Sequence, residues 1–111
     1  MLTRTVNLGG TECKVCDEAA GKFTWDQVDM DRYEPELFAA LEQHADPAGT
    51  FLDLGAFVGV FTLWAAARFA TVVAVEPDRK AYDLLLANAF LMDPATHEQR
   101  SWPARNAAGD P

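Results

Sequence analysis

The sequence is short of basic residues, and this shortage excludes a class of protein. Lysine and arginine total 9 against 17 acidic residues, which gives a net charge of −8 over 111 residues. Proteins that bind a nucleic-acid backbone carry basic patches, so we expect no nucleic-acid partner. The length allows at most one small domain, and the 50% hydrophobic content is typical of a globular one.

Long hydrophobic runs are also missing. Arg68 interrupts the most apolar stretch, residues 60–75, which is too short for the roughly 18 apolar residues of a membrane span. The N-terminal MLTRTVNLGG has one arginine and no apolar segment, unlike a signal peptide. We therefore expect no membrane association and a cytoplasmic location.

Cysteine is scarce as well, and the two that occur are Cys13 and Cys16, in TECKVCDE. This spacing would suit a zinc or redox site. The residues around it alternate as in a strand, however, and an offset of three places the two sulfurs on opposite faces. We expect ordinary thiols and no metal site.

The N-terminal residues predict a hairpin. Residues 4–16 alternate about Gly9 and Gly10, which is typical of two short strands joined by a tight turn. Residues 23–35 show no clear period, and we expect them to be irregular with a short helix near Trp25.

A helix is expected next. Pro35 suits a first helical position, and an apolar stripe follows it at helical spacing. The segment ADPAG, 45–49, then predicts a stop and a turn. We take residues 1–44 as a hairpin and cap helix. The stripe consists of Leu37, Phe38 and Leu41.

Two strands with a helix between them are predicted in the middle of the chain. TFLDL, 50–54, is a short apolar run that fits a strand buried on both faces. The stretch after Gly59 is rich in alanine and leucine and favours a helix. TVVAVE, 71–76, reads as the second buried strand. We expect core positions at Phe61, Leu63, Trp64 and Phe69.

A second helix follows, with Asp78 as its N-cap. Pro94 ends it, so residues 45–94 predict a parallel βαβα unit. Residues 95–111 lack an apolar period, and we expect an irregular tail. One face of the second helix carries Ala81, Leu84, Leu85 and Asn88, with Leu91 extending it.

The stretch FLDLGAFVG, 51–59, predicts a ligand site. Open α/β sheets bind ligands at the carboxyl ends of their strands, where Asp53 and Glu76 lie. An acid at the tip of the second strand typically accepts hydrogen bonds from ribose hydroxyls. The ligand is therefore expected to be a nucleoside.

Two nucleoside cofactors compete for this loop. A dinucleotide such as NAD needs a middle glycine beside its pyrophosphate, where this chain has Phe57, and Asp53 would repel a diphosphate. S-adenosylmethionine (AdoMet) has no phosphate and carries an ammonium and a sulfonium, which a carboxylate attracts. AdoMet is favoured, and an NAD-type domain is the alternative.

Together, FLDLGAFVGVFTLWAA and VVAVEPD resemble motif I and the following motif of class I AdoMet-dependent methyltransferases, and more narrowly the FkbM-type family. The upstream Tyr33, Glu34 and Pro35 are similar to a segment of some members, in which the first two would cover the site. The resemblance spans about residues 20–94. It implies a Rossmann-like fold and methyl transfer from sulfonium to a hydroxyl, expected on a sugar or secondary metabolite.

The resemblance also implies roles for individual residues. Asp53 would hold the amino group of AdoMet, Thr62 would help seat its carboxylate, and Glu76 would bind the ribose. The two loop glycines would let the backbone pass close to the methionine part, with Phe57 packed beside the cofactor. The implied cofactor site consists of Asp53, Gly55, Ala56, Phe57, Gly59, Thr62, Glu76 and Pro77.

The chain is shorter than members of that family, so the resemblance implies an N-terminal half only, a truncated member whose activity alone is open. No catalytic base and no acceptor site can be assigned from the sequence. The first strand would leave one sheet edge bare. A homodimer, or a non-catalytic half that pairs with a complementing chain, is therefore the other alternative.

Overall fold

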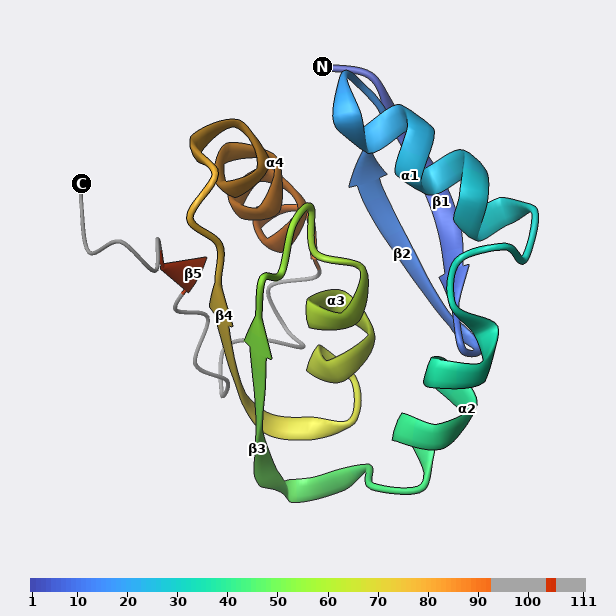
Figure 1. The fold of residues 1–111 in the computed structure, drawn as a ribbon, viewed down its shortest axis with the longest axis vertical. Coiled ribbons are helices and arrows are strands. Elements are labelled where there is room, and N and C mark those ends of the chain that lie inside the picture. Colours follow the sequence, from blue (N-terminus) through green and yellow to red (C-terminus); the bar gives the residue numbers. More distant parts are fainter. Residues whose placement is uncertain (93–103, 106–111) are drawn as a thin grey trace.

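The chain begins with two strands and two helices and then alternates between strand and helix, and the computed structural model describes residues 1–92 and 104–105 (Figure 1). Those residues form two small sheets and four helices, which confirms the α/β class. In chain order the elements are β1 (Thr3–Leu8), β2 (Thr11–Cys16), α1 (Ala20–Asp29), α2 (Pro35–Glu42), β3 (Asp46–Leu54), α3 (Val60–Ala66), β4 (Phe69–Val75), α4 (Arg79–Phe90) and β5 (Ala104–Arg105).

The predicted hairpin is confirmed. β1 and β2 pair antiparallel from Thr3 with Cys16 to Leu8 with Thr11. Gly9 and Gly10 both have positive φ, +60° and +96°, which the two-residue turn requires and glycine adopts without strain. One face of the hairpin is buried and carries Val6, Leu8, Cys13 and Val15.

The short helix predicted near Trp25 is confirmed as α1, but it begins at Ala20 and is longer than expected, so only residues 30–34 of the predicted irregular segment lie outside a helix. Trp25 is 0% exposed and anchors the helix in the core. Ala19, at the N-cap position, offers no side-chain acceptor, so the usual sequence signal for a helix start is missing here. Burial of one large ring stabilises this helix more than its local signals do.

Helix α2 begins at Pro35, as predicted, after Glu34 in the left-handed region. Phe38 and Leu41 pack against the core, whereas Leu37 is exposed, so the apolar stripe is narrower than expected.

No helix among the described residues is long and apolar enough to cross a membrane.

Strands β3 and β4 run parallel, with Thr50 beside Thr71 and Leu54 beside Val75. β3 begins at Asp46, so the predicted turn over 45–49 was wrong: those residues enter the strand with a register shift between Asp46 and Thr50. A local kink in a strand and a turn share the same Pro and Gly signals.

A two-residue strand lies within the segment predicted to be irregular. β5 pairs parallel with β4, Ala74 lying beside Ala104. The remainder of the predicted tail, and the predicted end of α4 at Pro94, lie outside the described residues.

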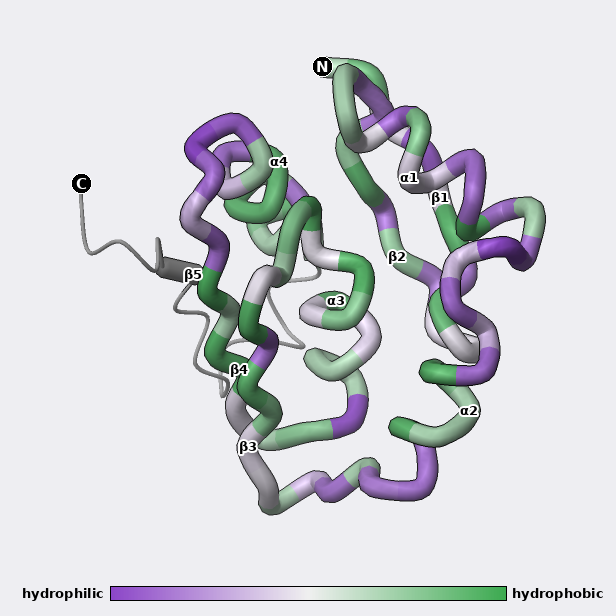
Figure 2. The backbone as a smooth tube through the Cα atoms, viewed as in Figure 1, coloured by the Kyte–Doolittle hydropathy of each residue, from purple (hydrophilic) through white to green (hydrophobic). Residues whose placement is uncertain are grey.

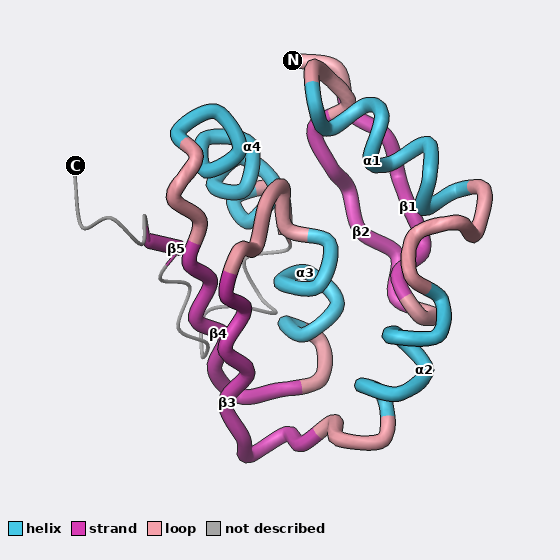
Figure 3. Tube along the Cα trace, in the orientation of Figure 1, coloured by secondary structure: helices cyan, strands magenta, loops and turns pink. Residues whose placement is uncertain are grey.

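Helix α3 lies between the β3–β4 sheet and the hairpin (Figures 1 and 3). Leu63, Trp64 and Phe69 are buried as predicted, and Phe61 is half-buried. The helix ends at Ala66, and Phe69 already belongs to β4. A helix with neighbours on two sides needs apolar residues almost all round, which explains its composition.

Asp78 caps α4 as predicted, since its carboxylate accepts the Ala81 N–H at 2.9 Å. Asn88 is fully buried on the predicted face of this helix. Its amide Nδ2 donates to the Val58 carbonyl and its Oδ1 accepts the Cys16 N–H, both at 2.7 Å. One side chain thus joins α4, the hairpin and the loop after β3.

One face of the β3–β4 sheet is bare, so the prediction of a strand buried on both faces was wrong. Leu52 and Leu54 are 56% and 71% exposed, and Figure 2 shows hydrophobic residues along both strands. Phe51 and Val72 face α3 instead. The described residues supply no element for the Leu52 side. A run of apolar residues looks the same with or without a covering layer, which is why TFLDL predicted burial on both faces.

Candidate functional site

The loop after β3 folds back onto the end of β4. The N–H groups of Gly55 and Ala56 both donate to the Val75 carbonyl, at 2.8 and 3.0 Å. Gly55 and Gly59 have φ of +76° and +106°. The two strand ends are thereby held side by side, with the loop between them.

The two glycines of the loop serve different purposes. A Cβ on Gly59 would lie 2.8 Å from Leu85 Cδ1, so this glycine allows α4 to pack closely. A Cβ on Gly55 would meet nothing within 4 Å. Only Gly55 therefore leaves an open side at the strand ends, where another molecule has room to approach the backbone.

Asp53 and Thr62 form a hydrogen-bonded pair beneath the loop. The Thr62 hydroxyl donates to Asp53 Oδ2 at 2.7 Å, and Thr62 is fully buried. Burial raises the pKa of Asp53, the Thr62 hydrogen bond opposes that rise, and the nearby Glu76 charge adds to it. Thr62 orients the carboxylate and is itself shielded from solvent.

Glu76 links the loops that follow β3 and β4. Its Oε1 accepts the Phe57 N–H at 2.7 Å and its Oε2 accepts the Asp78 N–H at 2.8 Å. The residue is 7% exposed, so it is not an ordinary solvated strand end. A buried carboxylate needs such partners, because an unpaired one would be strongly destabilising.

The structure brings together some of the predicted site residues and separates others. Asp53, Gly55, Phe57 and Glu76 gather at the strand ends, with Thr62 behind Asp53. The remaining three differ: Ala56 is buried in the small core with Ala74 and Leu85, Gly59 packs under α4, and Pro77 is exposed beyond β4.

Tyr33 lies closer to this site than its sequence position suggests. Its ring centroid is 6.1 Å from that of Phe61. Burial raises the pKa of Tyr33, and the charges of Glu34 and Asp53 raise it further. Tyr33 lines a pocket of about 140 Å³ between the β1–β2 turn and α2, but none of the eight residues of the implied cofactor site lines it.

The two cysteines are free thiols. Cys13 faces the core, and burial raises its pKa to about 11. Burial also raises the pKa of Cys16, and the neighbouring Glu18 carboxylate adds to this. Such thiols are poor nucleophiles and poor metal ligands at neutral pH. The described residues contain no group of three metal-binding side chains.

No protein-family model matches this chain, and no curated protein matches it either. The residue pattern and the geometry of the strand ends are therefore what point to a function. The ends of β3 and β4 bring together two carboxylates, an open glycine backbone and an aromatic ring.

Proposed function

We propose that β3, α3, β4 and α4 form a Rossmann-like unit that binds AdoMet, in a methyltransferase of the FkbM type. The observation that carries the proposal is the position of Asp53 and Glu76 at adjacent ends of two parallel strands, beside the open side of Gly55. Open α/β sheets bind their ligands at this end of the strands.

The charge at the strand ends favours a cationic ligand. Glu76 raises the pKa of Asp53, so the two carboxylates repel each other. A ligand cation would relieve that repulsion, whereas a pyrophosphate would add to it. Phe57 also occupies the position where a dinucleotide site has its middle glycine. Both features support AdoMet over NAD.

Each residue then has a role that its contacts allow. Asp53 would accept from the ammonium of AdoMet, while Thr62 holds the carboxylate in place. Glu76 uses one acceptor position on each oxygen for backbone N–H groups and retains others for ribose hydroxyls. Phe57, which is 39% exposed, would lie against the cofactor.

The reaction would be an in-line displacement. AdoMet, held by Asp53 and Glu76, would supply an activated methyl group: the acceptor oxygen would bond to the methyl carbon, the sulfur would leave as a neutral thioether with the bonding electron pair, and the hydroxyl proton would pass to water. Since the sulfonium is already activated, positioning contributes most of the rate. We assign no general base among the described residues, and the acceptor is a small-molecule hydroxyl in this proposal.

A second candidate function is a cofactor-binding part that works together with another chain. The bare face beside Leu52 and Leu54 favours it, because parallel sheets are usually covered on both faces. In that case AdoMet would bind without methyl transfer by this chain alone.

Calorimetric titration of the purified chain with AdoMet, and separately with NAD, tests the proposal. We expect AdoMet to bind and to stabilise the fold by about 2.7 kcal/mol at a hundred times the dissociation constant. Asp53→Asn should weaken AdoMet binding about tenfold, since it removes one charge-assisted hydrogen bond, and should leave NAD binding unchanged or stronger.

The matched control is Asp83→Asn, which removes an exposed carboxylate from α4 and should leave both affinities unchanged. Binding of NAD in preference to AdoMet, or tighter AdoMet binding by Asp53→Asn, would reject the assignment.

A further inference from the structure

Phe57 has a backbone conformation that a bulky residue seldom adopts. Its φ is +55°, in the left-handed region. For a residue with a large side chain this conformation is strained, and it persists only when the surroundings enforce it. The ring is 39% exposed, so packing of the side chain does not account for the enforcement.

The N–H of Phe57 supplies the explanation. It donates to Glu76 Oε1 at 2.7 Å, whereas the preceding N–H groups of Gly55 and Ala56 bond to the Val75 carbonyl. The loop therefore changes its anchor at Phe57, from the backbone of β4 to a side chain. The other oxygen of that side chain accepts the Asp78 N–H, which ties it to the start of α4.

We propose that Glu76 is a positioning residue that holds Phe57 in the left-handed region and so keeps the open side of Gly55 turned toward the ligand. The inference rests on the proposed function, because the ligand is taken to be AdoMet. It gives Glu76 a second role beside the ribose contact, since each carboxylate oxygen can accept more than one hydrogen bond.

This second role has a distinctive consequence. A loop that is already ordered needs no further ordering when the ligand binds. Loss of Glu76 would therefore weaken binding twice, through the ribose contact and through the loop. Glycine adopts positive φ without help, so in a Phe57→Gly background the loss of Glu76 should cost only the ribose contact and no longer the loop's share.

A double-mutant cycle measures how much of the affinity loss comes from the loop. Its four proteins are the unmodified chain, Glu76→Ala, Phe57→Gly and the double variant, each titrated with AdoMet. Glu76→Ala should weaken binding by about 10- to 100-fold, since buried N–H groups lose a charged acceptor. Phe57→Gly alone should weaken binding several-fold, because the ring that would lie against the cofactor is lost. Glu76→Ala should then cost about fivefold less affinity in the Phe57→Gly background than in the unmodified chain.

The control is Glu12→Ala, which removes an exposed carboxylate from β2 and should leave the affinity unchanged. An equal loss of affinity from Glu76→Ala in both backgrounds would overturn the positioning role, because the effect of a pure ribose acceptor does not depend on the residue at position 57.

Amide hydrogen exchange of the unmodified, ligand-free chain measures independently whether the loop is ordered at Phe57. The Phe57 amide should exchange roughly a hundredfold more slowly than in an unfolded chain, because it is hydrogen-bonded inside the loop. An unprotected Phe57 amide would overturn the positioning role even if AdoMet binds. Failure of every variant to bind AdoMet would reject the proposed function, and amide exchange would then decide the positioning role alone.

Discussion

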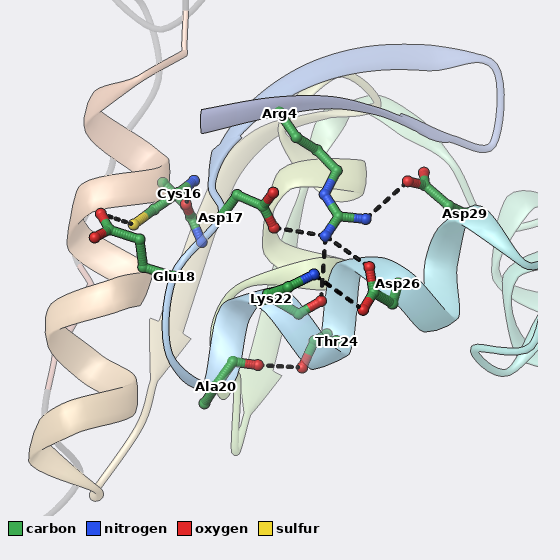
Figure 4. A network of polar contacts seen from close by, with 10 residues as sticks. Arg4, Cys16, Asp17, Glu18, Ala20, Lys22, Thr24, Asp26 and Asp29 are labelled. Atoms are coloured by element: carbon green, nitrogen blue, oxygen red, sulfur yellow. Dashed lines mark hydrogen bonds and ion pairs between the residues drawn. The ribbon is translucent and has the colours of Figure 1, made fainter. Parts of the chain in front are cut away.

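The acidic residues near the N-terminus and those at the strand ends are arranged in opposite ways. Arg4 donates to Asp17, Asp26 and Asp29 at 2.5, 2.8 and 2.9 Å (Figure 4). At the ends of β3 and β4, Asp53 has the hydroxyl of Thr62 as its partner and a second carboxylate nearby.

The pKa shifts follow this difference. The hydrogen bond from Arg4 lowers the pKa of Asp26, whereas burial and the Glu76 charge raise the pKa of Asp53. A carboxylate whose pKa is lowered, as that of Asp26 is, stabilises the folded state at neutral pH, and one whose pKa is raised, as that of Asp53 is, destabilises it. A destabilising charge that is retained in a site with open space suggests ligand binding rather than folding.

Replacing Arg4 should give the largest change in stability. Arg4→Gln removes the shared partner of three carboxylates and leaves them to repel one another, so we expect the unfolding midpoint to fall by about 5 °C at low salt. A thermal melt followed by circular dichroism measures this. High salt should reduce the difference, because it screens the partly exposed pairs.

Lys14→Gln is the control for Arg4→Gln, since it removes an exposed positive charge from β2 and should leave the midpoint nearly unchanged. An equal fall in both variants would mean that net charge, rather than the Arg4 cluster, determines the effect.

Replacing Asp53 should have a smaller effect of the opposite sign. The pKa of Asp53 is raised in the folded state, so the folded state holds its proton to higher pH than the unfolded state does. As the pH rises through the raised pKa, the fold loses stability. Asp53→Asn, which stays neutral and still offers an oxygen to Thr62, should melt at a higher temperature at neutral pH.

The same titration predicts how ligand affinity depends on pH. A cationic ligand requires the charged form of Asp53, so AdoMet affinity should fall as the pH drops through the raised pKa. Melts and titrations from pH 4 to 8 test both statements. A stabilisation by Asp53→Asn that is as large at pH 4 as at pH 8 would contradict the assignment of the shift to this carboxylate.

Features fixed by one or two neighbouring residues could be predicted from the sequence. The Gly9–Gly10 turn, Pro35 at the start of α2 and Asp78 as a helix cap each depend on local backbone chemistry. The meeting of Asp53 and Glu76 at adjacent strand ends was predictable for a similar reason, since each belongs to the end of an apolar strand.

Features that depend on distant partners could not be predicted. The hydrogen bond from Phe57 to Glu76 spans 19 positions, and Asn88 accepts from Cys16 across 72. The start and the length of helix α1 were likewise missed, because Trp25 is held by burial and no capping side chain marks the first turn. In each case the sequence shows the residue but not the neighbour that gives it its role.

The bare face of the β3–β4 sheet gives the smallest expected effect. Leu54 is 71% exposed, so Leu54→Gln removes little buried area and should change the free energy of unfolding by about 0.5 kcal/mol or less. Sedimentation should give the same molecular mass at every concentration, for the unmodified chain and for Leu54→Gln alike. A larger loss of stability, accompanied by a mass that rises with concentration only in the unmodified chain, would show that Leu54 is covered in solution. In that case the surroundings of Asp53 and of the acids around Arg4 would have to be compared in the assembled protein. The charge of a partner chain would then also act on Asp53.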